Sequence, residues 1–244
     1  MAFWRRISSR GMLVALAVVM SLAIWPAHSV AATQVSTFVF FEKFTPDNPH
    51  QWDVRKLTDG SQTFLAGGGY HLVRTRAGTM RGWPLKVTVP RGFQFNVKLQ
   101  ITRGSDPYAG VTFWDDLGNN FMLFVITPDG RAGLFAHTAK GYKSLVDWHT
   151  EAAIHKGIQA INSLGVNLDA VSAAEGRTLL INGVPLGKAC KDIWHAALGQ
   201  MPTPPAWGYR VGVLSGSYKG LTEVTVQRAS MYDGSKLSPA QPCP

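Results

Sequence analysis

Four side chains that carry oxygen atoms fall together between residues 115 and 120, at Asp115, Asp116, Asn119 and Asn120. Carboxylate and amide oxygens are the ligands that Ca²⁺ takes in proteins, so this segment could hold a calcium ion. The same residue types also favour tight turns, because their side chains bond the nearby backbone. The sequence therefore predicts either a turn without a cofactor or a calcium site at these four residues, and no other cofactor is expected.

Acid–base catalysis of glycoside cleavage needs a pair of carboxyl groups, about 5–5.5 Å apart in retaining enzymes. Glutamate occurs only at Glu42, Glu151, Glu175 and Glu223, and no two of these share a predicted strand. The seven histidines do not follow a standard zinc-ligand spacing. The sequence therefore assigns no catalytic residue.

Aromatic side chains suggest sugar binding, because a pyranose docks on a flat apolar ring and is held by polar groups around it. Trp114 is out of phase with the apolar Val111 and Phe113, so we expect it on the solvent-facing side of its strand. Trp148 and Trp207 are expected in the core. The other candidate ligand contacts are polar residues at solvent-facing strand positions: Asn96, Lys98, Gln100, Thr112 and Arg210. The alternative is a plain solvated sheet with one surface tryptophan.

The elements that must position these residues are short strands. Apolar and polar residues alternate from 93 to 102, which predicts a strand with one face on a core. The segments 108–114, 121–127 and 131–138 follow it, separated by turn residues, and the four together predict an antiparallel meander.

Turn chemistry identifies further elements. Asn182-Gly183 supplies the positive φ angles of a two-residue hairpin turn between strands 177–181 and 184–186. Residues 191–199 are expected to form one or two short helical turns. About ten to twelve strands in one domain predict an all-β fold, a two-sheet antiparallel β-sandwich of jelly-roll type.

The order of several short motifs resembles the concanavalin A-like lectin/glucanase superfamily, in particular exported bacterial modules of laminin-G-like or 3-keto-disaccharide-hydrolase-like type. The motifs are Tyr-Ala-Gly-Val-Thr-Phe at 108–113, Asp-x-x-x-Asn-Phe-x-x-Phe-x-Ile-x-Pro-Asp-Gly at 116–130, Leu-Val-Asp-Trp-His-Thr at 145–150, Leu-Leu-Ile-Asn-Gly at 179–183 and Gly-x-x-Val-Gly-Val at 208–213. The resemblance covers residues 38–232 and implies a concanavalin A-like jelly roll. Residues 191–205 depart from the pattern.

The first 32 residues have the layout of a secretory signal peptide. Arg5, Arg6 and Arg10 precede an apolar run at 12–25, and small residues follow at 30–32. The run is shorter than the roughly 20 residues that a spanning helix needs, so no stable membrane insertion is expected after cleavage. We therefore predict a signal peptide at 1–32, a sandwich domain at 33–234 and a tail at 235–244, in a periplasmic or secreted protein; the alternative is an uncleaved anchor.

The chain has two cysteines, Cys190 and Cys243. An even number of cysteines in an exported chain favours a disulfide. A bridge between them would pin the tail and, in the chain-entropy account, stabilise the fold by about 4 kcal/mol.

The formal net charge of +9 is scattered along the chain and accompanies no nucleic-acid-binding signature. The leading interpretation is an exported, non-catalytic module that binds a glycan or another cell-envelope polymer. The alternatives are a hydrolase acting on a sugar derivative of the 3-keto-glycoside type, which the resemblance implies, and an adhesion domain that binds a protein.

Overall fold

The computed structural model describes residues 37–90, 92–116, 120–168, 177–186, 192–201 and 210–234. The predicted signal peptide at 1–32, the predicted disulfide partners Cys190 and Cys243, the tail at 235–244 and Asn119 lie outside these residues. Within the described segments, no helix is long and apolar enough to cross a membrane.

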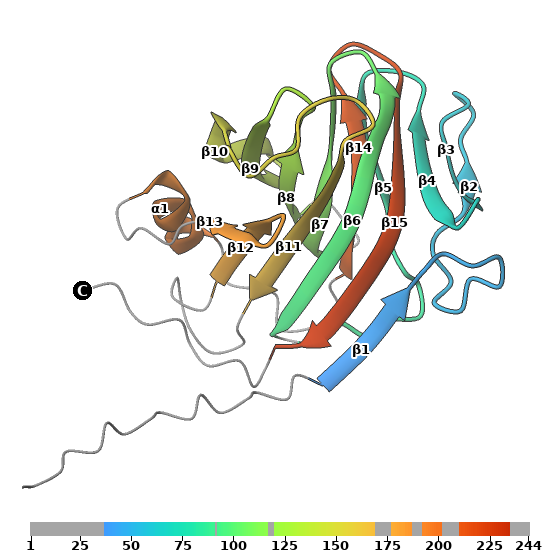
Figure 1. Cartoon of the computed structure of the whole chain (residues 1–244), viewed down its shortest axis with the longest axis horizontal. Helices are drawn as coiled ribbons and strands as arrows, with labels where there is room; N and C mark the ends of the chain where they lie inside the picture. Colours follow the sequence, from blue (N-terminus) through green and yellow to red (C-terminus); the bar gives the residue numbers. More distant parts are fainter. Residues whose placement is uncertain are drawn as a thin grey trace, which may run out of the picture. The chain divides into compact units, whose positions relative to one another are not determined.

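Two antiparallel sheets form the domain (Figure 1). The first has the strand order β13-β12-β11-β6-β15-β4-β3-β2, with β1 paired to β15. Its strands are β1 (Thr37–Glu42), β2 (Arg55–Lys56), β3 (Gln62–Ala66), β4 (Gly69–Arg74), β6 (Phe93–Gly104), β11 (Ile161–Leu168), β12 (Arg177–Ile181), β13 (Val184–Leu186) and β15 (Thr222–Asp233).

The second sheet has the order β10-β9-β8-β7-β14-β5. Its strands are β5 (Gly78–Gly82), β7 (Pro107–Asp115), β8 (Phe121–Ile126), β9 (Arg131–Thr138), β10 (Gly141–Thr150) and β14 (Arg210–Ser217). A single described helix, α1 (Ile193–Gln200), packs against β10. These elements confirm the predicted all-β sandwich.

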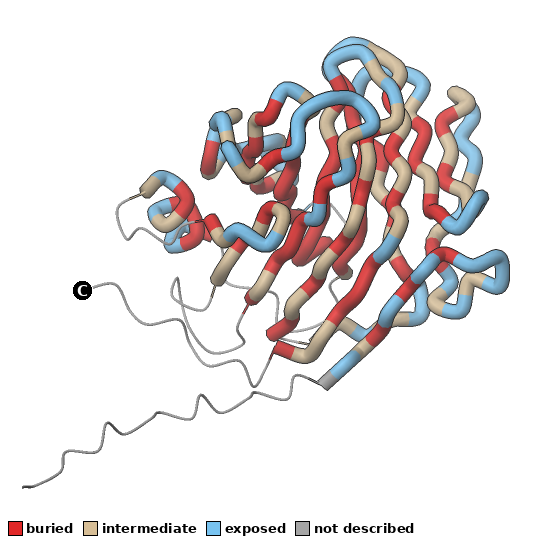
Figure 2. Tube along the Cα trace, viewed as in Figure 1, coloured by how far each residue is buried: buried red, intermediate tan, exposed pale blue. Residues whose placement is uncertain are grey.

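The core lies between the two sheets, as the buried segments in Figure 2 show. The predicted alternation of β6 is confirmed, because Phe95, Val97 and Leu99 are buried while the polar residues between them are partly exposed. A strand whose apolar side chains all point one way can only bury them against a second layer. The alternation thus fixes which side of β6 faces the core.

The predicted meander begins one strand later than the sequence suggested. Strands β7, β8, β9 and β10 are sequential neighbours, but β6 lies in the other sheet, between β11 and β15. The chain passes between the sheets through the short segment that follows Gly104, in which Asp106 adopts a φ of 54°. The alternating pattern of β6 says which face is buried, but not in which sheet the strand is paired.

Local turn chemistry was predicted correctly. Asn182 and Gly183 have φ angles of 51° and 80°, as a type I′ hairpin turn requires. The helical segment is also present, and its N-cap Asp192 accepts a hydrogen bond from the backbone N–H of His195 at 2.7 Å.

Candidate functional site

Strand β8 is apolar on both of its faces. Its side chains alternate between the sandwich core, which receives Met122, Phe124 and Ile126, and the opposite side of the six-stranded sheet. On that opposite side, Phe121, Leu123 and Val125 form a second buried cluster with Leu214 of β14. We call this side of the six-stranded sheet the outer face. Because a strand exposed to water on one side normally carries polar residues there, an apolar outer face marks a surface that other groups cover.

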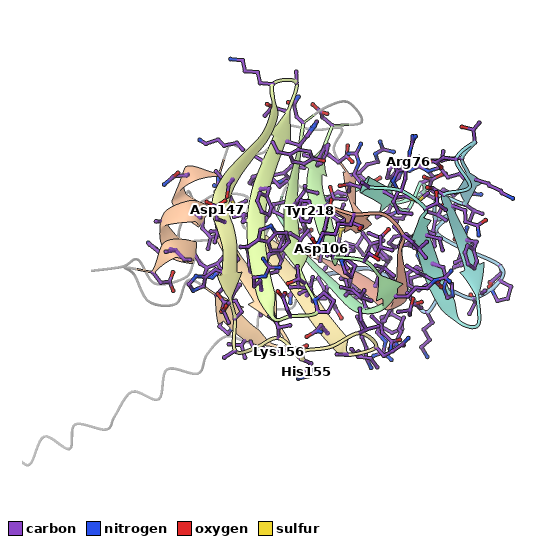
Figure 3. The ribbon with its side chains drawn as sticks, turned by 90° about the horizontal axis from the view of Figure 1, so that it is seen from above. Arg76, Asp106, Asp147, His155, Lys156 and Tyr218 are labelled. Carbon is purple, nitrogen blue, oxygen red and sulfur yellow. The ribbon has the colours of Figure 1, made fainter. Side chains whose placement is uncertain are left out.

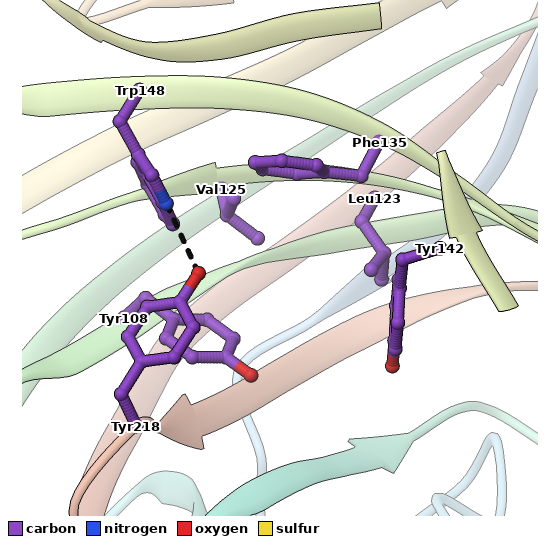
Figure 4. A pocket seen from close by; sticks show the side chains of 7 residues that line it. All are labelled: Tyr108, Leu123, Val125, Phe135, Tyr142, Trp148 and Tyr218. Atoms are coloured by element: carbon purple, nitrogen blue, oxygen red, sulfur yellow. Dashed lines mark hydrogen bonds between the residues drawn. The ribbon is translucent and has the colours of Figure 1, made fainter. Parts of the chain in front are cut away.

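A pocket of about 200 Å³ is formed on the outer face (Figure 4). It is lined by aromatic and aliphatic side chains from four strands and the loop after β14: Tyr108, Leu123, Val125, Phe135, Tyr142, Trp148 and Tyr218. Leu123 and Val125 belong to the apolar side of β8 described above.

Trp148 and Tyr218 are held together on one side of the pocket. The indole Nε1–H of Trp148 donates a hydrogen bond to the hydroxyl of Tyr218 at 3.0 Å (Figure 4). The ring of Trp148 lies 5.5 Å from that of Phe135 and 6.1 Å from that of Tyr108, both in tilted geometry. These contacts fix the orientation of the Trp148 indole.

Tyr108 contributes a more buried phenol. Its hydroxyl forms a 2.7 Å hydrogen bond with the hydroxyl of Thr79 on β5. Burial raises the pKa of Tyr108 above its ordinary value, because the phenolate would lose its hydration. The ring lies directly over Gly216 of β14, where any Cβ atom would overlap it. A side chain at position 216 would therefore change the shape of the pocket.

The loop that carries Tyr218 is fixed by its own hydrogen bonds. The hydroxyl of Ser217 donates to the carbonyl of Ser105 at 2.5 Å and accepts from the backbone N–H groups of Lys219 and Gly220, both at 3.0 Å. The backbone N–H of Tyr218 donates to the carbonyl of Asp106, and Figure 3 shows these two residues next to each other. The Tyr218 side chain is 57% exposed, so a ligand can reach it.

Arginines gather at one end of the outer face. The Arg81 guanidinium forms a 2.6 Å ion pair with Asp115 and lies 4.0 Å from the centre of the Phe121 ring. The Arg210 guanidinium lies 3.9 Å from the centre of the Trp83 ring. The outer face thus combines an aromatic pocket with a basic, aromatic end.

The prediction that Trp114 faces solvent is wrong. Trp114 is 4% exposed and belongs to the sandwich core, where its ring contacts Phe113 edge-on at 5.5 Å. The pairing of β7 with β14 shifts between Thr112 and Asp115, and Trp114 has a φ of 53°. This bulge inserts an extra residue, so two successive side chains point into the core and the simple alternation fails.

The other predicted ligand contacts are not brought together. Asn96, Lys98 and Gln100 alternate with the core residues of β6 and therefore lie on the side of the nine-stranded sheet that faces away from the core. Thr112 and Arg210 belong to the six-stranded sheet. With the core between the two groups, they cannot form one surface. Thr112 is also 1% exposed rather than solvent-facing.

In the segment from Asp115 to Asn120, predicted to be either a turn or a calcium site, the two carboxylates contact donor groups of the protein. Asp115 is paired with Arg81, as described above. Asp116 accepts hydrogen bonds from the backbone N–H of Asn120 at 3.2 Å and from its side-chain amide at 2.7 Å. These are bonds typical of a turn. Calcium binding at this segment remains a prediction, since Asn119 lies outside the described residues.

Trp148, which we expected in the core, instead lines the pocket. A sequence signal for the outer face was nevertheless present in β8, whose sequence Phe-Met-Leu-Phe-Val-Ile does not alternate, unlike that of β6. A short uninterrupted apolar run indicates a strand covered on both faces.

No protein-family profile matches the chain, and no curated protein sequence is detectably similar to it. Solved structures do share its fold. The laminarinase catalytic domain from Thermotoga maritima matches with a TM-score of 0.55 at 9% identity, over 81% of this chain and 98% of that one. This chain also matches a laminarinase catalytic domain from Thermotoga petrophila with a TM-score of 0.53 at 9% identity, over 81% of this chain and 98% of that one. It matches a structure described with the endo-acting O-glycanases of human gut bacteria with a TM-score of 0.53 at 10% identity, over 81% of this chain and 99% of that one.

Proposed function

Because this chain has the concanavalin A-like jelly-roll fold, we propose that it is a non-catalytic carbohydrate-binding module whose ligand lies on the outer face. The pocket between Tyr108, Trp148 and Tyr218 is the main sugar subsite. The structurally similar proteins described above act on glycans, which supports a glycan as the ligand.

The chemistry of the pocket carries this proposal. A pyranose has apolar C–H faces and a rim of hydroxyl groups, so it suits a site of aromatic rings with polar tips. Tyr142 and Tyr218 are both 57% exposed, and each carries a hydroxyl that can donate or accept a hydrogen bond. Trp148 is already oriented by its bond to Tyr218, so little side-chain entropy is lost when a sugar binds.

The residues on the outer side of β8 support binding rather than hydrolysis. Phe121, Leu123 and Val125 occupy these central positions, and none of the three can move a proton. Asp115 lies on the neighbouring β7, where Arg81 contacts its carboxylate at 2.6 Å. The Asp115 carboxylate is thus already bound by a cation of the protein itself.

The test is binding of the purified 33–244 chain to an array of oligosaccharides and to insoluble polysaccharides. We expect retention of at least one glycan, lost in Tyr218→Ala and in Trp148→Ala. Phe38→Ala is the matched control, because it removes an exposed aromatic ring from β1, in the other sheet. No retention of any glycan, or equal retention by all four proteins, would overturn the proposal.

The proposal includes export of the module, with cleavage after the predicted signal peptide at 1–32. N-terminal sequencing of protein recovered from the periplasm or medium tests this directly. A mature chain that begins near Thr33 is expected, and recovery of the intact N-terminus in the membrane fraction would indicate an anchor instead.

A further inference from the structure

We infer that the glycan is acidic, and that Arg210 binds its anionic group beside the sugar pocket. The inference rests on the proposed function and adds the charge class of the ligand. The anionic group is a carboxylate, sulfate or phosphate carried by the sugar chain.

The basic end of the outer face adjoins the pocket. Arg81 lies over Phe121, and Phe121 is two residues from Leu123, which lines the pocket from the same side of β8. Strands rise by about 3.3–3.4 Å per residue, so the two positions are about 7 Å apart. Arg210 is paired across the strands with Asp115, the residue that holds Arg81. Gly216, which lies under the Tyr108 ring, is six residues from Arg210 along β14, or about 20 Å, so a glycan several sugars long could reach from the main subsite past Leu123 to both arginines.

Arg210 differs from the other arginines of this cluster in its charge environment. Arg81 is paired with Asp115 at 2.6 Å. Arg55 of β2, whose guanidinium also lies over the Trp83 ring at 5.0 Å, is paired with Asp53 at 3.2 Å. Arg210 forms no ion pair with any described residue, and its Nε–H is buried without an acceptor among them.

The surroundings of Arg210 oppose its charge. Burial lowers the pKa of Arg210, and the charge of Asp115 acts in the opposite direction. An arginine nevertheless stays protonated in proteins, so its charge has to be stabilised by other groups. The ring of Trp83, 3.9 Å away, provides a cation–π contact but accepts no strong hydrogen bond.

Two further buried groups at this end lack a partner among the described residues. They are the indole Nε1–H of Trp83 and the hydroxyl of Thr112, which is 1% exposed. Thr112 pairs with Gly212, two residues along β14 from Arg210, and the backbone of Gly212 lies against Trp83. Both of these groups are covered by protein atoms, so the contact with an anion is assigned to the guanidinium of the partly exposed Arg210, which donates charge-assisted hydrogen bonds.

The experiment compares acidic glycans with neutral forms of the same chains. The probes are polygalacturonate, hyaluronate and chondroitin sulfate, each before and after its charges are removed by carboxyl reduction or desulfation. We expect the 33–244 chain to bind at least one acidic probe about tenfold more tightly than its neutral form, which corresponds to about 1.4 kcal/mol. This preference should weaken as salt is raised, because salt screens charge–charge attraction.

Arg210→Gln tests the assigned residue. It should reduce affinity for the acidic probe to that of the neutral form while leaving neutral binding unchanged, whereas Arg210→Lys should keep part of the preference because it keeps the charge. Arg103→Gln is the control, since Arg103 is an exposed arginine on β6 in the other sheet. Thermal melts establish that each variant is folded.

The outcomes separate the two proposals. Neutral probes bound as tightly as acidic ones, with binding lost in Tyr218→Ala, would overturn the acidic ligand and leave the glycan function standing. An acidic preference that survives undiminished in Arg210→Gln would overturn the assignment of Arg210. No binding to acidic or neutral probes would contradict the glycan function itself.

Discussion

The indole Nε1–H of Trp148 donates a 3.0 Å hydrogen bond to the hydroxyl of Tyr218, joining β10 to the loop after β14 across three intervening strands of the six-stranded sheet. The two residues are 70 positions apart in the sequence. The bond closes one side of the pocket and holds two rings that the proposed sugar would contact. The pocket is therefore a product of the sheet order rather than of any local motif.

Trp148→Phe tests this bond. The substitution keeps an aromatic ring but removes the N–H donor, so Tyr218 loses one hydrogen bond at a partly exposed site. We expect the free energy of unfolding to fall by about 0.5–1.5 kcal/mol. Urea denaturation measures the change, and Tyr218→Phe should produce a similar loss. A double variant that loses the sum of the two single effects would show that the bond contributes nothing.

Trp114→Ala tests the corrected position of Trp114. A buried aromatic ring replaced by alanine leaves a cavity, and the expected loss is about 3–5 kcal/mol in the free energy of unfolding. Thermal or urea unfolding measures it. A loss of about 0.5 kcal/mol or less, which is usual at surface positions, would indicate that the Trp114 side chain is exposed and contradict its buried position.

The observed positions of Trp114 and Trp148 show where the sequence fails to predict which face of a strand a side chain lies on. Alternation placed the side chains of β6 correctly over residues 93–100, where β6 pairs with β11 without a register shift. Strand β7 contains a bulge before Asp115, and the pairing of β10 with β9 shifts twice. Since a shift of one residue moves a side chain to the other face, both tryptophans were assigned to the wrong side.

The apolar composition of the outer face was partly predictable from the sequence, but the residues that meet beside it were not. The uninterrupted apolar sequence of β8 indicates cover on both sides, and this signal points to the correct sheet. That Arg81, Asp115 and Arg210 meet beside it depends on which strands are neighbours. Such long-range pairing is not encoded in local periodicity.

Gly216→Ala tests the shape of the pocket without removing any lining residue. A methyl group at 216 would overlap the ring of Tyr108, so the ring must move and its hydrogen bond to Thr79 must break or stretch. We expect glycan affinity to fall about tenfold, which corresponds to about 1.4 kcal/mol. Titration calorimetry with the best-bound glycan measures this. Phe38→Ala, which removes an exposed ring from β1 in the other sheet, is the control. Equal losses in both variants would contradict a specific role of Gly216.

Tyr108→Phe tests the burial of this phenol through the dependence of stability on pH. The pKa of Tyr108 is raised in the folded protein, mainly by desolvation, above the ordinary value of about 10. The folded state therefore holds this proton more tightly than the unfolded state. The resulting stability is fully present below about pH 10 and is lost as the pH rises through the folded pKa.

Wild-type protein should consequently lose more of its free energy of unfolding above about pH 10 than Tyr108→Phe does. Urea denaturation at a series of alkaline pH values measures the difference. Parallel profiles for the two proteins would show that the phenol of Tyr108 is not desolvated by the fold.

Glycan binding on the outer face of the six-stranded sheet is tested most directly by mapping the bound ligand through NMR chemical-shift changes. We expect the resonances of the Trp148 indole N–H and of the backbone amides of Phe135 and Tyr218 to shift when the glycan saturates the protein. The amides of Asn96 and Lys98, in the other sheet, should stay unchanged. Shifts concentrated at Asn96 and Lys98, with Trp148 unaffected, would contradict it.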